Sequence, residues 1–172
     1  QKPRILVVGS FVMVVIATTE QVPGPGQTVY GKSFHTAPGG KGANQALQCA
    51  RLGAEVTMVG CVGDDLFGRQ LLEPLQNAGV DTSHVIVRSD CHSGVGHVTL
   101  AVSGHTAQNR IIVIPGANLT LKASEVSWLR EQIAEYDLVL LQLEIPLEVN
   151  LAVARFAREA GVPAILNPAP AA

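Results

Sequence analysis

The sequence predicts an α/β fold: a mostly parallel sheet with helices on both faces, plus a small antiparallel β lid. Short apolar runs alternate with amphipathic helical segments along the chain. Two further stretches, at about 12–34 and 94–114, are rich in β-branched residues and lack a helical period. With 172 residues, 47% of them hydrophobic, the chain is long enough to bury a core, so we expect residues 1–172 to belong to a single domain.

The elements of the main sheet follow from the apolar spacing and from the glycines that end helices. Gly53, Gly79 and Gly161 each follow an amphipathic segment, and Ser124 is a potential helix cap. In order, we expect a strand at Arg4–Val8, a helix at Lys41–Leu52, a strand at Val56–Val62, a helix at Phe67–Asn77, a strand at Val85–Val87, a helix at Ala123–Glu135, a strand at Leu138–Leu143, a helix at Leu147–Ala160 and a strand at Ala164–Leu166.

The lid is predicted to consist of two β excursions. Val12–Thr18 is expected to pair with Thr28–Phe34 through the PGPG turn at 23–26. Gly94–Val102 is expected to pair with Arg110–Ile114 through residues 103–109. This layer would stand off the main sheet as a lid or a dimer surface.

Composition limits the kinds of partner. A net charge of −2 gives no electrostatic reason to expect nucleic acid or an anionic membrane. The longest apolar run, Phe11–Ala17, is too short to span a bilayer, and the widely spaced Cys49, Cys61 and Cys91 fit reduced thiols better than a disulfide framework. We therefore expect a soluble, cytoplasmic protein.

A metal site is not expected. The histidines at 35, 84, 92, 97 and 105 do not form the short pairs typical of zinc sites, so they are expected on the surface or in the lid. Asp64 and Asp65, between two glycines, are better explained as a loop leading to a helix cap than as cation ligands.

The segment TAPGGKGANQA, at 36–46, is the strongest candidate for a binding site. Its glycines allow close approach of a ligand to the backbone, and the following helix start would offer unpaired N–H donors. Lys41 and Asn44 would suit a small hydroxylated molecule. A glycine-rich turn with a solvated lysine explains the local pattern equally well. A Walker loop is excluded because Gly42 follows Lys41, and the first strand is not followed by a dinucleotide-binding fingerprint.

An ordered series of motifs resembles the ribokinase family of carbohydrate kinases. The motifs extend over the whole chain, and the combination of GGKGANQA, QLE and NPAPA is the most specific part. The series is Gly9-Ser10, PGPGQTV at 23–29, GGKGANQA at 39–46, RLGA at 51–54, VGDDLFG at 62–68, PGAN at 115–118, QLEIP at 142–146 and NPAPA at 167–171.

The resemblance implies ATP-dependent transfer of a phosphoryl group to the primary hydroxyl of a pentose, D-ribose above all, giving ribose 5-phosphate. It also implies ATP, Mg²⁺ and a monovalent cation (K⁺) as cofactors, and a dimer formed through the β lid. The sugar would lie over the carboxyl ends of the strands. Glu144 matches a family glutamate near the sugar, although a carboxylate capping the helix after Pro146 is an equal alternative, and Asn167 would have a supporting role. The implied sugar-binding residues are Gly40, Lys41, Gly42, Ala43, Asn44 and Glu144.

Two departures from the family pattern stand out. Val12 and Val14 occupy positions where the family presents Asn and Asp to sugar hydroxyls. Losing a carboxylate that grips hydroxyls removes roughly 1.5–3 kcal/mol, so the substrate is less hydroxylated there, the site is impaired, or the sequence is altered relative to a working parent.

The second departure is length. Family members run further, and the segment with the catalytic Asp, the anion hole, the nucleotide site and the cation loop would lie beyond Ala172. We therefore expect no catalytic residue in this chain, and no turnover by the chain alone. The alternative to a kinase is a non-catalytic module that binds sugar or associates through its β layer.

Overall fold

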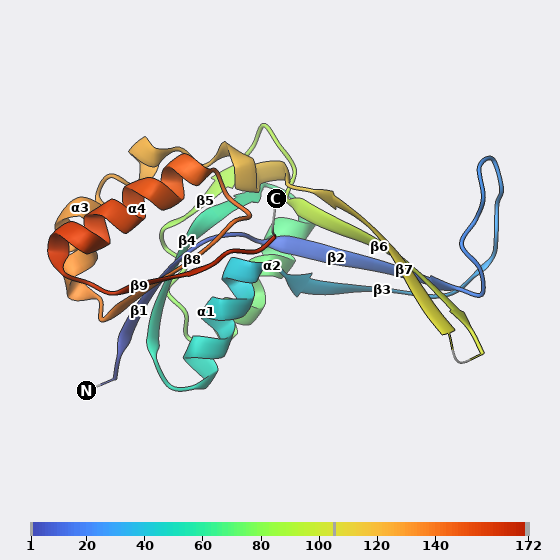
Figure 1. The fold of residues 1–172 in the computed structure, drawn as a ribbon, viewed down its shortest axis with the longest axis horizontal. Helices are drawn as coiled ribbons and strands as arrows, with labels where there is room; N and C mark the ends of the chain where they lie inside the picture. The colour runs from blue at the N-terminus through green and yellow to red at the C-terminus, as the bar shows by residue number, and fades with distance from the viewer. Residues whose placement is uncertain (1, 105, 171–172) are drawn as a thin grey trace.

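The computed structural model describes residues 2–104 and 106–170 and contains two sheets (Figure 1). In the five-stranded main sheet the strand order is β5-β4-β1-β8-β9, and every neighbouring pair is parallel. The predicted fold class is confirmed. The strands are β1 (Arg4–Val8), β4 (Glu55–Gly63), β5 (Val85–Arg88), β8 (Leu138–Gln142) and β9 (Ala164–Asn167).

Helices cover both faces of this sheet, as the sequence predicts. α1 (Lys41–Arg51) and α2 (Leu66–Asn77) lie on one face, and α4 (Leu147–Ala160) lies on the other with the short α3 (Leu129–Gln132) (Figure 1). Because successive side chains of a strand point to opposite faces of the sheet, the core is divided into one cluster on each face. In β1, Val7 packs with the α1–α2 cluster, whereas Leu6 and Val8 pack with the α4 cluster. The core residues on both faces thus fix the register of β1.

The helix predicted at Ala123–Glu135 is wrong as a continuous element. The structure has a 3₁₀ turn at Ala123–Val126, then α3, then a second 3₁₀ turn at Ile133–Glu135. Ser124 does not cap it; the Lys122 N–H donates to the Glu125 carboxylate at 2.9 Å instead. Val126, Leu129 and Ile133 are fully buried, so three short turns place the apolar side chains where one helix was expected to place them.

The second sheet is the predicted lid. Its order is β3-β2-β6-β7, formed by β2 (Val12–Thr19), β3 (Gly31–Gly39), β6 (Gly94–Ser103) and β7 (Thr106–Ile114). Both hairpins are antiparallel as expected, but the strand predicted at Thr28–Phe34 is instead Gly31–Gly39, and the strand predicted at Arg110–Ile114 begins at Thr106. In addition, β2 and β6 pair in parallel, so the sheet as a whole is mixed. The sheet extends away from the body, with the loop between β2 and β3 at its far end (Figure 1).

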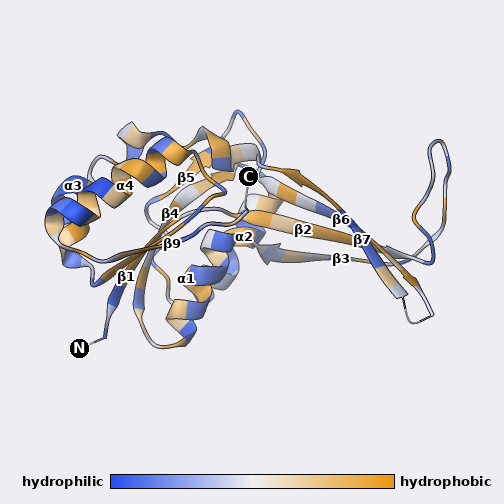
Figure 2. Cartoon of the chain, viewed as in Figure 1, coloured by the Kyte–Doolittle hydropathy of each residue, from blue (hydrophilic) through white to orange (hydrophobic). Residues whose placement is uncertain are grey.

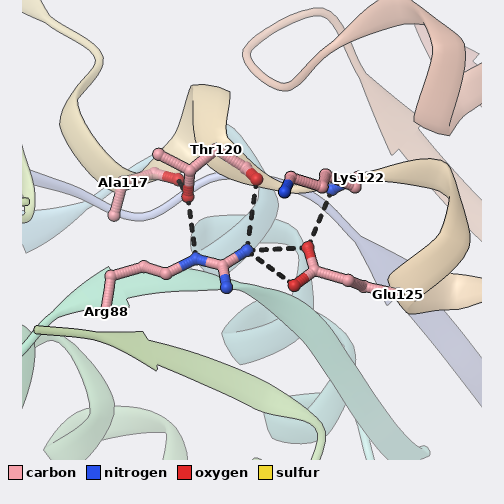
Figure 3. Close-up of polar contacts among 5 residues, drawn as sticks. All are labelled: Arg88, Ala117, Thr120, Lys122 and Glu125. Atoms are coloured by element: carbon pink, nitrogen blue, oxygen red, sulfur yellow. Dashed lines mark hydrogen bonds and ion pairs between the residues drawn. The ribbon is translucent and has the colours of Figure 1, made fainter. Parts of the chain in front are cut away.

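A group of hydrogen bonds around Arg88 fastens the edge of the main sheet to the turn that follows the lid. Arg88, at the end of β5, donates to the Thr120 hydroxyl at 3.0 Å and to both Glu125 oxygens at 2.9 and 2.7 Å (Figure 3). The hydrogen bond from Arg88 lowers the pKa of Glu125 below its usual value. Thr120 ends the 3₁₀ turn η1 (Gly116–Thr120), so the hydrogen bonds of Arg88 anchor that turn to β5.

No helix in the described part of the chain is long and apolar enough to cross a membrane.

Candidate functional site

A cavity of about 310 Å³ lies where the carboxyl ends of β1 and β8 meet the base of the lid. Ligands of open α/β sheets bind in this kind of crevice. A more open hollow of about 640 Å³ lies at the far end of the lid, remote from the strand ends. The cavity, rather than that hollow, collects the predicted residues. It is lined by Val12, Lys41, Val113, Pro115, Asn118, Leu119, Leu143, Glu144 and Pro170.

Glu144 is the polar centre of the cavity. It follows β8 and is only partly exposed. One of its oxygens accepts hydrogen bonds from the Ser10 hydroxyl and from the Lys41 N–H, the latter at 2.9 Å. The other lies 3.9 Å from the Lys41 ammonium. A carboxylate at the positive end of a helix is electrostatically favourable, and this one links β1, β8 and α1.

The start of α1 is therefore already hydrogen-bonded, contrary to the expectation of unpaired donors. Lys41 N–H donates to Glu144, Gly42 N–H donates to the Ser10 hydroxyl at 3.3 Å, and Ala43 N–H donates to the Ser10 carbonyl at 2.9 Å. The described hydrogen bonds of Glu144 go to Ser10 and Lys41 and not to the helix that follows Pro146, whose N-cap Pro146 makes no side-chain cap bond. Glu144 caps α1 instead.

The remaining predicted residues are divided between the cavity and its surroundings. Gly40 has φ +100°, and a Cβ there would lie 2.7 Å from the Ser10 carbonyl oxygen, so glycine is required. Ala43 is buried in the core, and the exposed Asn44 lines a separate hollow of about 220 Å³. Asn167 is exposed on the edge strand β9 and does not line the cavity.

The lid contributes apolar walls. Val12 is 8% exposed and lines the cavity, together with Val113 from β7. Val14 follows on the same face of β2 but is not among the lining residues. The structure thus brings Lys41, Glu144 and Val12 together, and leaves Asn44 and Asn167 outside.

Sequence reasoning missed two polar residues at this site. Ser10 was noticed only as part of Gly9-Ser10, although its hydroxyl joins Glu144 to α1. Asn118, in the PGAN segment, lines the cavity and is 1% exposed. The available signal for Ser10 was a polar residue two positions after a buried strand, whereas nothing local distinguished Asn118.

Potential metal ligands are dispersed in the described residues. Across 2–104 and 106–170, no three His, Cys, Asp or Glu side chains gather as a metal site. His35, His84, His92 and His97 are exposed as predicted, and His105 lies outside the described residues. Asp65 is the predicted helix cap, since it accepts a hydrogen bond from the Gly68 N–H at 2.7 Å.

The comparison with known families now agrees with this geometry. Residues 2–172 match the pfkB family of carbohydrate kinases, and the chain belongs to that family. Within it, the chain is similar to ribokinases. It is 44% identical to the ribokinase of Bacillus subtilis over 98% of this chain and 56% of that protein. It is 43% identical to the ribokinase of Lactococcus lactis over 98% of this chain and 55% of that protein.

A solved relative has the same fold. The structure of Arabidopsis thaliana ribokinase, complexed with ribose and ATP, superposes with a TM-score of 0.89 at 34% identity, over 98% of this chain and 54% of that one. The chain spans about half the length of the curated relatives it matches.

Proposed function

We propose that the complete protein transfers a phosphoryl group from ATP to the primary hydroxyl of a pentose, D-ribose in the first place, and that this chain supplies the sugar-facing half of the site. The observation that carries the proposal is the meeting of Lys41 and Glu144 in one cavity beneath the lid. The similarity to ribokinases, one of them solved with ribose and ATP, supports the choice of sugar.

The chemistry of the two side chains suits a polyol. The Glu144 carboxylate accepts hydrogen bonds and the Lys41 ammonium donates them, so together they can hold neighbouring hydroxyls. Bound sugar would displace water from the cavity, and the apolar wall of Val12 and Val113 would cover it from the lid side.

The cavity does not fit the Mg²⁺ of the reaction. The cavity has a single carboxylate, and that group is already engaged by Ser10 and Lys41, so it lacks the oxygen ligands that Mg²⁺ needs. We propose that ATP, Mg²⁺ and K⁺ bind to a part of the protein outside this chain, together with the catalytic Asp. On this proposal the 172-residue chain binds sugar without phosphorylating it, and ribose turnover by the purified chain above a no-enzyme blank would contradict it.

Calorimetry of ribose binding tests the sugar site. Lys41→Ala and Glu144→Gln should each weaken binding, by about tenfold or more, because each removes a charge-assisted hydrogen bond. Lys32→Ala is the matched control, since Lys32 also pairs with a glutamate, Glu20 at 2.8 Å, but lies on the lid away from the cavity. Equal affinity in all four proteins would mean that the glycine-rich segment is only a structural turn. Asn44→Ala tests the neighbouring hollow, which Asn44 lines: weaker ribose binding in this variant would mean that the sugar contacts that hollow as well as the cavity.

A second candidate is a non-catalytic module that binds sugar or associates through the lid. Val12 in the cavity wall favours it, because valine cannot satisfy a hydroxyl that faces it. Exposed apolar residues on the lid favour association, and we propose a dimer formed through this sheet.

A further inference from the structure

We propose that Asn118 is a positioning residue, which fastens the lid to the main sheet at a single pivot around Phe11. The role goes beyond sugar binding, because it concerns where the lid stands whether or not a ligand is present. The cavity walls Val12 and Val113 belong to the lid, so their position depends on this attachment.

The chain passes between body and lid at four points, and all four meet at this pivot. It enters the lid after Phe11 and leaves it at Gly40; it enters again at Gly94 and leaves at Pro115. Gly94 pairs with Val12 in the parallel ladder between β2 and β6. Phe11 itself is completely buried among core residues. The four crossings therefore share one small, densely packed region.

Asn118 makes three hydrogen bonds there through its side chain. Its carbonyl oxygen accepts from the Phe11 N–H at 2.8 Å, and its amide nitrogen donates to the Phe11 carbonyl at 2.7 Å. The same nitrogen donates to the Pro115 carbonyl at 2.8 Å. One amide thus satisfies both backbone groups of Phe11, which lies between β1 and β2, and holds the chain that returns from β7.

The packing at the pivot leaves no room for a side chain at Gly94. A Cβ at Gly94 would lie 2.7 Å from the Phe11 carbonyl oxygen and 2.9 Å from the Pro115 carbonyl oxygen, and would overlap the Asn118 amide. The lid has little other support, since β3 and β7 are almost wholly exposed along their length. Apart from the contacts of β2 and β3 with α2, the hydrogen bonds at the base hold the lid over the cavity.

Asn118 is in turn held from outside the pivot. It lies in η1, whose last residue, Thr120, is bound by Arg88 (Figure 3). The hydrogen bonds of Asn118 at the pivot are thereby connected to β5 at the edge of the main sheet. This arrangement distinguishes Asn118 from an ordinary buried amide: it connects a rigid edge of the body to the strands that cover the cavity.

Hydrogen exchange of backbone amides in the 172-residue chain tests the proposal without any ligand. Asn118→Ala should accelerate exchange of protected amides in β2 and β6 by about tenfold or more relative to amides of β1 and β4. Asn150→Ala is the matched control, because Asn150 is also a buried amide, 4% exposed, but bonds the Gln142 carbonyl in the body. Equal acceleration of lid and body amides in Asn118→Ala would overturn the proposal.

Two further variants cover the case of poor folding. Asn118→Asp keeps the acceptor for Phe11 but turns a carboxylate oxygen toward the Phe11 and Pro115 carbonyls, so we expect a lid-selective effect at least as large as that of Asn118→Ala. Gly94→Ala disturbs the same hydrogen bonds from the other side and should also loosen the lid selectively. If Asn118→Ala and Asn118→Asp both unfold the body together with the lid, Asn118 is a general core residue and the proposal is wrong.

A ribose titration adds a second measurement, which rests on the proposed function. Asn118→Ala should weaken binding although its amide is committed to backbone groups, whereas Asn150→Ala should not. If Asn118→Ala gives lid-selective exchange but the wild type does not bind ribose, the proposed sugar site is contradicted and the proposed role of Asn118 is still supported.

Discussion

At the scale of single residues, Glu144 shows how one carboxylate can organise a site from three distant parts of the chain. Its partners Ser10 and Lys41 lie 134 and 103 residues away in sequence. A ligand hydroxyl that reaches Glu144 therefore meets an acceptor that already has donors. The free energy of binding then depends on the difference between the hydrogen bonds that Glu144 makes with the ligand and those that it makes without it. Because this difference is small, the neighbouring wall residues are important for affinity.

Val12 is the wall residue with the clearest expected effect on affinity. Replacing Val12 by Asn and Val14 by Asp would present polar groups where the chain now has valines. If the sugar reaches them, the dissociation constant for ribose should fall by about tenfold or more, and Val12→Asn alone should give the larger share because only Val12 lines the cavity. Calorimetry measures the change.

Ile16→Asn is the control for this prediction. Ile16 lies on the same face of β2 but four residues further from the cavity, so its replacement should leave the affinity unchanged. An unaltered affinity in the double variant would show that the substrate does not reach the lid wall.

At the scale of elements, the start of α2 illustrates a cap that also ties down a loop. Asp65 accepts from the Gly68 N–H at 2.7 Å and from the Ser93 N–H at 2.8 Å, and Ser93 is completely buried. Burial opposes ionisation of Asp65, but its hydrogen bonds with Ser93 and Gly68 outweigh burial and lower its pKa below the ordinary value of 3.8. Ser93 precedes β6, so the cap holds one entrance to the lid.

The stabilisation from Asp65 should depend on pH in a defined direction. A group with a lowered pKa contributes stability above its unfolded value, and the contribution is lost as pH falls below 3.8 through the folded pKa. At pH 7, Asp65→Asn should lower the free energy of unfolding by about 1–3 kcal/mol, because the new amide turns a donor toward the buried Ser93 N–H. Urea unfolding at several pH values measures this difference, which should shrink in acid.

The neighbouring Asp64 gives the control. It is an exposed residue whose only described ion pair is with Arg69 at 3.7 Å, so Asp64→Asn should change the free energy of unfolding little. Equal effects of the two substitutions would contradict the assignment of Asp65 as the cap.

The elements differ in how far the sequence could predict them. Buried strands and α4 were predicted to within a residue or two, because their apolar spacing and the glycine at 161 are local signals. The form of the segment 123–135 could not be predicted in this way, since apolar residues spaced three and four apart can be buried by a helix or by 3₁₀ turns, and packing against α4 decides between them. The contact of Glu144 with Ser10 arises only from the order of strands β1 and β8, which no local pattern specifies.

At the scale of the whole molecule, a continuous row of apolar side chains lies on the face of the lid that lines the cavity. The face that carries Val12 continues outward through Val14, Ile16, Val98 and Ile111, as the ladder registers show. Much of β2 is coloured hydrophobic in Figure 2. Ile111 is 55% exposed, so this apolar face lacks a full covering in the single chain. The open edge strand β9, with Ile165 56% exposed, is a second surface of the same kind.

We therefore predict that the chain associates in solution, and that the lid face is the larger contributor. Ile111→Asp should shift the chain toward the monomer in light scattering at about 100 µM, because it places a charge in the centre of the apolar face. Phe34→Asp is the matched control: Phe34 is 68% exposed but lies on the opposite face, since the adjacent His35 pairs with Ile16. Loss of association with Phe34→Asp alone would place the interface on the other face of the lid.

Ile165→Asp tests the β9 edge in the same way. A monodisperse wild-type monomer at this concentration would contradict the prediction as a whole, because the two exposed apolar surfaces would then remain separate in water.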